Sequence, residues 1–555
     1  MRYVLLASVA SLMTVGCDEI KSQMDSASSK AEGKPAAHQM TANKDRLEAD
    51  VRYLADDLLE GREAGTRGYD LAARYVAERY RAIGLEPGGP DGSYYQQVPM
   101  REVRAADPTG GTLTLSGANA PAAFVKGEDY LVGSSAKAAE AVVEAPMVFV
   151  GFGLVAEEYD RDDFAGLDVD GKIVVYLPGA PKFLGSEERA HYSSTTSQRA
   201  SERGAVGTIR LYTPDREKRF SFSRIAHYLA TSTGMSWMKE DGTPFSQTPN
   251  IKAGATVSLK GAEALFANAP TQWAEIVTAL EDEQGDVKGF DMNMTGRLET
   301  SSIHRALSSP NVVGVMRGSD PKLRDEYIVL TGHLDHVGIQ KTDEEGDDEL
   351  HNGAMDNASG VASMLEVATL LAHNPPKRSL IFVSLTAEEK GLVGSDYFAQ
   401  NPTVPADQVV ANINLDMPVL TYEFSDVVAF GGERSTMYPV VEAAAKRAGL
   451  TLSPDPQPEQ GFFTRSDQYS FVKQGIPAVY LDLGFGNNGE EAQGEFFKKH
   501  YHKPSDEVEV MDMEALRRFA QVNYEIADGV GNMPVRPLWK KGDFFATMFD
   551  GPMEE

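Results

Sequence analysis

The chain has 555 residues, of which 42% are hydrophobic and 24% charged, and its formal net charge is −29. This length is too great for one ordinary hydrophobic core, and the composition is that of a globular protein, which excludes collagen-like and intrinsically disordered classes. The negative charge argues against nucleic acid and anionic membrane surfaces as partners, because both repel a polyanion.

The N-terminal stretch MRYVLLASVASLMTVGC combines one early arginine with a short apolar run. That run is too short to span a bilayer comfortably, so it predicts a secretory signal peptide over residues 1–16. Cys17, the only cysteine of the chain, directly follows Gly16. This ending resembles the lipobox of bacterial lipoproteins, which implies cleavage before Cys17 and a lipid anchor on that residue. The protein is then expected at the cell envelope, facing the periplasm or the extracellular side; a plain secretory signal with an incidental cysteine is the alternative.

Residues 17–44 are polar, rich in small residues and aperiodic, which predicts a flexible tether. Two amphipathic helices are expected next, over residues 45–105, as the first piece of a domain that resumes after residue 290. The stretch DRLEADVRYLADDLLEGR places apolar residues at helical spacing: Leu47, Val51, Leu54 and Leu58. The stretch GYDLAARYVAERYRAIGL has the same character, and its helix is expected to end at Gly84.

Residues 106–290 have a different texture, because strand-like runs alternate with Gly, Pro and Asp turns. Among these runs are TLTLSG, MVFVGFGL, KIVVYLPG and VGTIRLY. The stretch VFVGFGLV, followed by DDFAGLDVDGKIVVYLPG and ASERGAVGTIRLY, resembles the protease-associated domain. The resemblance implies a β-rich module inserted between residues 45–105 and the domain that follows it.

Residues 291–533 alternate between strand-like and helical runs, which is the α/β signature. Strand-like runs include NVVGVMRG, EYIVLTG, SLIFVSLTAEE and VVANINLDM, and the helical run ASGVASMLEVATLLAHNPP stops at a proline pair. We expect a mixed, mostly parallel sheet with helices on both faces. Residues 534–555 are expected to form a loose acidic extension.

Ligand-type side chains stand where the predicted strands end. His333 ends IVLTGH, Glu388 and Glu389 end LIFVSLTAEE, and Asp416 ends VVANINLD. Because the carboxyl ends of strands in an open parallel sheet point into one crevice, these side chains are expected to converge. Asp356, which opens a predicted helix in NGAMDNASG, is expected to join them.

The donor types suit zinc, which accepts imidazole nitrogen and carboxylate oxygen. Two zinc ions bridged by one carboxylate need two further ligands each, so five protein ligands suffice. The five candidates are His333, Asp356, Glu389, Asp416 and, from the late stretch HYHKPSDE, His502. Glu388 is left over, and a spare carboxylate beside a metal is placed to take a proton from water.

Six motifs in order strengthen this interpretation: GHLDHVG, GAMDNASGV, TAEEKGLVGS, INLDM, RSDQYSFVKQGIPA and YHKPSDE. In this order they resemble the co-catalytic dizinc exopeptidases, family twenty-eight of the metallopeptidases, over about residues 45–100 and 300–530. The stretch LADDLLEGREAGTRGYDLAARYVAERYRAIGLEP is typical of the bacterial aminopeptidase branch. The resemblance implies a zinc exopeptidase fold of the phosphorylase/hydrolase-like type.

The resemblance also implies how the two Zn²⁺ ions are held. Asp356 bridges both ions, His333 and Asp416 complete one site, and Glu389 and His502 complete the other.

Further roles follow from the same resemblance. Glu388 is the general base and then the general acid, and Tyr501 stabilises the oxyanion. Asp335 holds the ring of His333, as ligating imidazoles usually require. The peptide bond between Asp356 and Asn357 is expected to be cis.

For two further residues the sequence allows two interpretations each. His336 is expected either to line the pocket or to be solvated. Arg465 is expected either to capture a peptide carboxylate through its planar guanidinium or to form a structural ion pair.

The implied activity is hydrolysis of the N-terminal residue of peptides by a water molecule held between two zinc ions, with Glu388 as base. The alternatives within the superfamily are a carboxypeptidase and a glutaminyl cyclase. A non-catalytic binding protein is the rival from another class, and loss of ligands would indicate it.

Overall fold

The computed structural model describes residues 40–107, 109–282, 284–341 and 346–555. The predicted signal peptide over residues 1–16, the lipidation site Cys17 and most of the predicted tether lie outside the described residues. Within them, Ala42–Glu555 form one compact unit. None of the helices in the described ranges combines the length and the apolar character that a bilayer span requires.

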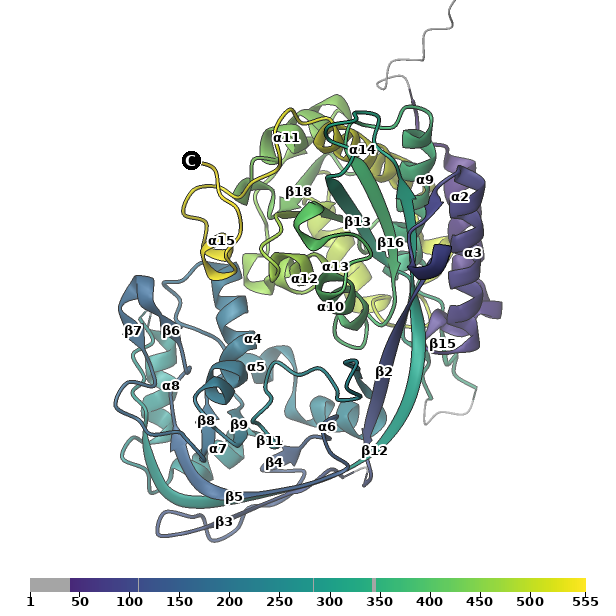
Figure 1. Cartoon of the computed structure of the whole chain (residues 1–555). Helices are drawn as coiled ribbons and strands as arrows, with labels where there is room; N and C mark the ends of the chain where they lie inside the picture. Colours follow the sequence, from purple (N-terminus) through teal and green to yellow (C-terminus); the bar gives the residue numbers. More distant parts are fainter. Residues whose placement is uncertain (1–39, 108, 283, 342–345) are drawn as a thin grey trace, which may run out of the picture. The chain divides into compact units, whose positions relative to one another are not determined.

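The sheet that carries the predicted site is mixed and mostly parallel (Figure 1). Its strands, in spatial order, are β19 (Thr451–Leu452), β18 (Asp426–Phe430), β20 (Ala478–Leu483), β17 (Val409–Asn414), β13 (Tyr327–His333), β16 (Ser379–Leu385) and β12 (Phe290–Met316). Strand β13 runs parallel to both of its neighbours, β16 and β17, and β17 runs parallel to β20. Strand β12 is antiparallel to β16, and β18 is antiparallel to β20. The predicted α/β class is confirmed.

The helices around this sheet are α2 (Lys44–Leu54), α3 (Arg67–Ile83), α9 (Ser359–Ala372), α10 (Val393–Gln400), α11 (Tyr438–Arg447), α12 (Gln468–Val472), α13 (Gly489–Lys499) and α14 (Met513–Gly531). Helix α3 begins and ends where its sequence predicts. The side chain of Thr66 accepts a hydrogen bond from the backbone N–H of Tyr69, and Gly84 ends the helix with a φ of 93°.

Both faces of the sheet are covered, as the apolar strands require. Val383 of β16 packs in one cluster with Phe398 of α10 and Phe471 of α12. The next residue back along the strand, Phe382, points to the opposite face because side chains alternate along a strand. There its ring meets Tyr80 of α3 at a centroid distance of 6.5 Å.

The first predicted helix is shorter than its periodicity suggests. Helix α2 ends at Leu54, and the side chain of Leu58 is 74% exposed. The carboxylate of Asp56 accepts a hydrogen bond from the backbone N–H of Leu58 and so starts a separate 3₁₀ turn over Asp57–Arg62. Side chains of this kind compete with the helix for backbone N–H groups. The turn carries Arg62 inward, where it is buried.

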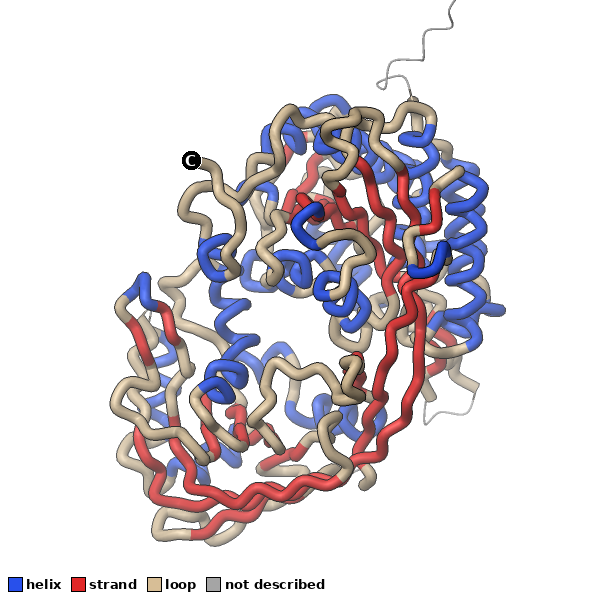
Figure 2. The backbone as a smooth tube through the Cα atoms, in the orientation of Figure 1, coloured by secondary structure: helices blue, strands red, loops and turns tan. Residues whose placement is uncertain are grey.

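The predicted insertion over residues 106–290 contains helices as well as strands, so the expectation of a β-rich module is incomplete (Figure 2). Its strands include β3 (Thr112–Ser116), β4 (Tyr130–Val132), β5 (Glu140–Phe149), β8 (Ile173–Tyr176), β9 (Gly207–Leu211) and β11 (Ala253–Val257). Its helices include α4 (Ser186–Glu202), α5 (Pro214–Arg219), α6 (Phe222–Thr231), α7 (Leu259–Phe266) and α8 (Trp273–Glu281). Strands β5, β8, β9 and β11 are parallel neighbours, and parallel strands need long crossover connections, which helices usually supply.

The long strand β12 links this segment to the sheet that carries the predicted site. It is 27 residues long, pairs with β3 and β5 near its start, and pairs with β2 (Tyr95–Ala105) and β16 toward its end. The segment has its own cluster of buried apolar side chains, which runs from Leu113 to Leu298 in the sequence. Hydrogen bonding is therefore continuous through β12, and apolar contact between the two parts is made by Trp237, which packs in one cluster with Val98 and Val393.

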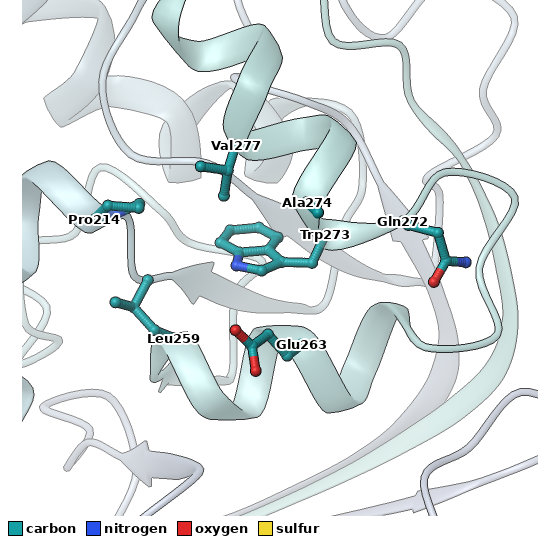
Figure 3. A pocket seen from close by; sticks show the side chains of 7 residues that line it. All are labelled: Pro214, Leu259, Glu263, Gln272, Trp273, Ala274 and Val277. Atoms are coloured by element: carbon teal, nitrogen blue, oxygen red, sulfur yellow. The ribbon is translucent and has the colours of Figure 1, made fainter.

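A surface cavity of about 470 Å³ lies within the same segment (Figure 3). The residues that line it are Pro214, Leu259, Glu263, Gln272, Trp273, Ala274 and Val277. None of them belongs to the predicted metal site.

The predicted loose extension over residues 534–555 is wrong, because this segment is packed. The side chain of Trp539 is fully buried, and its Nε1–H donates a hydrogen bond of 2.7 Å to the carbonyl of Gly475. Phe545, in the short helix α15 (Phe544–Met548), joins the same apolar cluster as Trp539 and Tyr469. The acidic residues suggested a solvated tail, but the aromatic residues between them determine the packing.

Replacing Trp539 with Ala is expected to lower the free energy of unfolding by about 3–5 kcal/mol, the usual cost of removing a buried aromatic side chain. Urea or thermal unfolding followed by circular dichroism measures this change. The matched control is Val535→Ala in the same segment, where the side chain is 60% exposed and little change is expected. Equal stabilities of the two variants would contradict the packed arrangement.

Candidate metal centre

The predicted ligands converge at one edge of the sheet. His333 is the last residue of β13, Glu388 and Glu389 follow β16, and Asp416 follows β17. Because these three strands are parallel neighbours, their carboxyl ends lie together.

The first donor group contains His333, Asp356 and Asp416. The Nε2 atom of His333 lies 3.0 Å from Oδ1 of Asp416 and 3.2 Å from Oδ1 of Asp356. All three residues are buried, and their ligand-type atoms lie within 4.8 Å of one another. The Nδ1 atom of His333 lies 3.0 Å from the backbone carbonyl of Asp335, which can only accept. The proton of a neutral imidazole is therefore held on Nδ1, and Nε2 faces the carboxylates.

The second donor group shares Asp356. Its other oxygen, Oδ2, lies 3.1 Å from Nε2 of His502, and the same nitrogen lies 3.4 Å from Oε2 of Glu389. The five predicted ligands are thus together, and each oxygen of Asp356 faces a different histidine. His336 also belongs here, because its ring nitrogen lies within 4.8 Å of oxygen atoms of Asp356 and Glu389.

Asp335 lies against His333, but its two polar groups act in different places. Its carbonyl accepts from the ring of His333, whereas the carboxylate oxygens accept hydrogen bonds from the backbone N–H groups of Glu388 and Glu389, at 3.0 and 3.3 Å. Asp335 therefore links the loop after β13 to the loop after β16 and fixes the backbone of both glutamates.

The backbone at Asp356 is held from several sides. Asp506 accepts hydrogen bonds from the backbone N–H groups of Met355 and Asp356, at 2.9 and 3.1 Å. The side chain of Asn357 donates to the carbonyl of Leu415, at 3.0 Å. The peptide bond between Asp356 and Asn357 is cis, which confirms the sequence prediction.

Arg62 supports the loops that carry the donors. Its buried guanidinium donates hydrogen bonds to the carbonyls of Leu334 at 2.9 Å, Asn352 at 2.6 Å and Gly353 at 3.0 Å, and also to the carbonyl of Leu54. Burial lowers the pKa of Arg62 to about 10, although nearby carboxylates such as Asp506 and Asp335 oppose this shift. The group therefore stays charged at neutral pH beside an acidic site.

The carboxyl groups differ in their affinity for protons. Burial by itself raises the pKa of Asp356, but contacts with His333 and His502 overcome this effect and hold the pKa well below its ordinary value. Burial raises the pKa of Glu388 well above its ordinary value; His333 opposes this shift, and Glu389 adds to it. Asp467, fully buried nearby, has a pKa raised to about 7, chiefly by burial. The structure thus contains an ionised carboxylate between the two donor groups and proton-accepting carboxyl groups beside it.

The donor set fits zinc. Ligands of a tetrahedral zinc ion, with bonds of about 2.0–2.2 Å, are about 3.4 Å apart. The histidine–carboxylate contacts of the two groups span 3.0–3.4 Å. Several carboxylates are buried close together at this site, and Arg62 supplies only one positive charge. Burying so many like charges is unfavourable unless further cations bind between them.

The predicted oxyanion residue Tyr501 lies against a donor. Its ring centroid is 4.0 Å from that of His502, and burial first, then Asp356 and Glu389, raises the pKa of its phenol. Arg465 is exposed, its Nη1–H donates to the carbonyl of Gln460 at 3.4 Å, and its guanidinium lies over the ring of Phe462. Among the described residues no carboxylate forms an ion pair with Arg465. The structure therefore does not support the alternative that Arg465 has a structural ion pair.

Sequence reasoning missed several residues that shape the site: Arg62, His336 as a buried donor, Asp467 and Asp506. Asp467 lies inside the motif RSDQYSFVKQGIPA, and Asp506 lies inside YHKPSDE, four residues after His502. Their place in these motifs was the only sign in the sequence that they could lie near the site. Arg62 acts through backbone carbonyls, for which the sequence carries no pattern.

An α/β fold with two histidine–carboxylate groups that share one aspartate defines a candidate two-cation centre. Residues 311–527 match the sequence model of Peptidase family M28. This range contains all five predicted ligands and Glu388.

Named relatives match parts of the chain. Aminopeptidase YwaD of Bacillus subtilis (strain 168) is 26% identical over 249 residues, which are 44% of this chain and 48% of that protein. A probable zinc metalloprotease of Pyrenophora teres f. teres (strain 0-1) is 39% identical over 106 residues, which are 19% of this chain and 22% of that protein. The chain thus spans less than half of the length of these two relatives. The solved structure of the aminopeptidase from Aneurinibacillus sp. strain AM-1 aligns with a TM-score of 0.48 and 19% identity, over 94% of this chain and 100% of that one.

Proposed function

We propose that the protein is a zinc-dependent aminopeptidase that holds two Zn²⁺ ions and removes the N-terminal residue of peptides. One observation carries the proposal: the buried carboxylate of Asp356 presents Oδ1 to His333, at 3.2 Å, and Oδ2 to His502, at 3.1 Å. A carboxylate in this position has one donor oxygen for each of two neighbouring cations. The match to Peptidase family M28 and the relatives named as aminopeptidases support it independently.

His333 and Asp416 would hold one ion, Glu389 and His502 the other, and Asp356 both. Divalent cations in such a centre act as Lewis acids toward a peptide carbonyl and make a water molecule more acidic.

Glu388 is the proposed base. Asp335 accepts a hydrogen bond of 3.0 Å from its backbone N–H, and none of the described residues donates a hydrogen bond to its side-chain carboxylate. The carboxylate is therefore available to substrate. It takes one proton from the attacking water as the new C–O bond forms, and it returns that proton to the leaving nitrogen as the C–N bond breaks. Its form at neutral pH is the carboxylate when cations are bound, because positive charge nearby favours ionisation.

The charge around the site favours an N-terminal substrate. Besides the proposed ligands, the buried acidic residues include Asp335, Asp467 and Asp506, and Arg62 is turned toward backbone carbonyls. Two divalent cations and Arg62 would balance most of this negative charge. The acidic groups that remain would favour the α-ammonium of a free peptide N-terminus over a terminal carboxylate. Tyr501, beside His502, is placed to donate a hydrogen bond to the oxyanion that forms at the carbonyl.

A panel of aminoacyl p-nitroanilides, each compared with its Nα-acetylated form, tests this function. We expect hydrolysis of the free amines and a kcat/KM at least about 100-fold lower for the acetylated forms, because a site built for a polar group discriminates strongly against its loss. A chelator should abolish turnover, and Zn²⁺ should restore it.

Three outcomes would contradict the proposal. Chelator-resistant turnover excludes the metal mechanism. Release of C-terminal residues from acetylated peptides indicates a carboxypeptidase. Loss of ammonia from an N-terminal glutamine, without peptide cleavage, indicates a glutaminyl cyclase.

A further inference from the structure

His336 is a buried histidine that the proposed function does not use. It lies in the loop after β13, and its exposed fraction is 0%. The alternative that its side chain is solvated is therefore wrong. Among the described residues neither of its ring nitrogens has a partner with hydrogen-bond geometry, and its close charged contact is with the carboxylate of Glu389. A fully buried imidazole with so few polar contacts is unfavourable, because burial removes the water that would satisfy both nitrogens.

The ring of His336 points into the second donor group. Its Nδ1 atom lies 2.9 Å from Oε1 of Glu389, an oxygen that also has no hydrogen-bond partner among the described residues. The ring packs edge to face against His502, with centroids 5.5 Å apart. Ligand-type atoms of His336, Asp356 and Glu389 all lie within 4.8 Å of one another.

The surrounding backbone holds the ring in this position. The backbone N–H of His336 donates a hydrogen bond of 3.3 Å to the carbonyl of Arg62, and the guanidinium of Arg62 donates one of 3.0 Å to the carbonyl of Gly353. Gly353 has a φ of 57°, and a Cβ atom there would lie 2.6 Å from two ring atoms of His336. The residue beneath the ring must therefore be glycine, and the imidazole has little freedom to turn away.

We infer that His336 is a further ligand of the ion that Asp356, Glu389 and His502 hold. This inference rests on the proposed function and deepens it. The second ion then has four protein donors, whereas the first has only His333, Asp356 and Asp416. The second ion, which has one protein donor more, is therefore expected to be held more firmly, and the first is the exchangeable one.

A different role for His336 is to orient Glu389 through a hydrogen bond, without contact to the ion. Glutamine separates the two roles, because its side-chain amide can donate a hydrogen bond to Glu389 but is a poor zinc ligand. Loss of an orienting contact typically weakens metal affinity by about 10–100-fold. Loss of a ligand should weaken it further.

The experiment measures Zn²⁺ content of the full chain by elemental analysis across a series of buffered free-zinc concentrations. For the wild type we expect release in two steps, with the second ion retained at free zinc at least about 10-fold lower than the first. For His336→Gln we expect the tight step to weaken by more than about 100-fold. The matched control is His351→Gln, a buried histidine on the neighbouring strand β15 (Leu350–His351), whose Nδ1 meets the carbonyl of Glu349 and which lies outside both donor groups.

Each result decides the inference. A weakening of 100-fold or less in His336→Gln overturns it, and so does simultaneous release of both ions from the wild type. Should His336→Gln fail to fold, judged by circular dichroism, the two-step release of the wild type remains the deciding measurement. A wild type that binds no zinc contradicts the proposed function, whereas one that binds two ions and cleaves aminoacyl amides but releases both ions together contradicts only the role of His336.

Discussion

Replacing Glu388 with Gln is expected to lower kcat by about 10²–10⁴-fold, the usual contribution of a general acid–base group, with little change in KM. The amide has nearly the shape of the carboxyl group, so packing and the hydrogen bond from the backbone N–H of residue 388 to Asp335 are preserved. It can neither accept the proton of the attacking water nor return it to the leaving amine. The proposed ligands are untouched, so the zinc content should equal that of the wild type.

Steady-state kinetics on an aminoacyl p-nitroanilide, together with elemental analysis of the same sample, check both expectations. Glu490→Gln is the matched control, because Glu490 is exposed in the first turn of α13. Glu388→Asp retains a carboxylate but shortens the side chain, and it should keep more activity than Glu388→Gln. Wild-type kinetics in Glu388→Gln would remove the base assignment, and a loss of zinc would mean that Glu388 is a ligand instead.

The positions of the predicted ligands were readable from the sequence because a parallel sheet imposes a simple rule. Residues that follow apolar strands come to one edge, so His333 and Asp416 were expected at the same edge, and the structure makes their strands β13 and β17 neighbours. The bridging position of Asp356 and the use of His502 did not follow from that rule. The bridging role of Asp356 came from the resemblance carried by six motifs in order, and His502 was the histidine that the late stretch HYHKPSDE supplies.

The groups that hold the ligands in place were not readable, because they act on backbone atoms. Arg62 donates to carbonyls from distant parts of the chain, and Asp506 accepts from the N–H groups of Met355 and Asp356. Hydrogen bonds to backbone atoms leave no periodic pattern in the sequence, and they do not require a particular residue type as the partner. His336 was ambiguous for a related reason: its burial depends on Gly353, which lies close only in the folded chain.

Local patterns also failed where tertiary packing or side-chain capping opposed them. The spacing of Leu58 extends the helical pattern of α2, yet the carboxylate of Asp56 binds the backbone N–H of Leu58 and the helix ends earlier. The acidic composition of residues 534–555 predicted a loose tail, but burial of Trp539 and Phe545 outweighs the cost of ordering that segment.

Replacing Asp356 with Ala should abolish binding of both zinc ions together, which is the largest effect expected of any single substitution. The side chain supplies one oxygen to each donor group. Its removal leaves His333 and Asp416 on one side, and Glu389, His502 and the inferred ligand His336 on the other, without the carboxylate that joins them. Zinc content should fall from about two ions to almost none per chain, and activity should be lost with it, since both proposed sites lose a donor.

Asp416→Ala is the informative comparison for Asp356→Ala. The carboxylate of Asp416 lies 3.0 Å from Nε2 of His333 and belongs to the first donor group only, so this variant should lose one ion and keep the other. Ligand binding to the folded state raises stability, so added Zn²⁺ should raise the Tm of the wild type and of Asp416→Ala but leave that of Asp356→Ala unchanged. Two zinc ions retained by Asp356→Ala would show that the groups around His333 and His502 are independent sites. Loss of a single ion would assign Asp356 to one group alone, and in either case the proposed shared centre, and the mechanism built on it, would have to be abandoned.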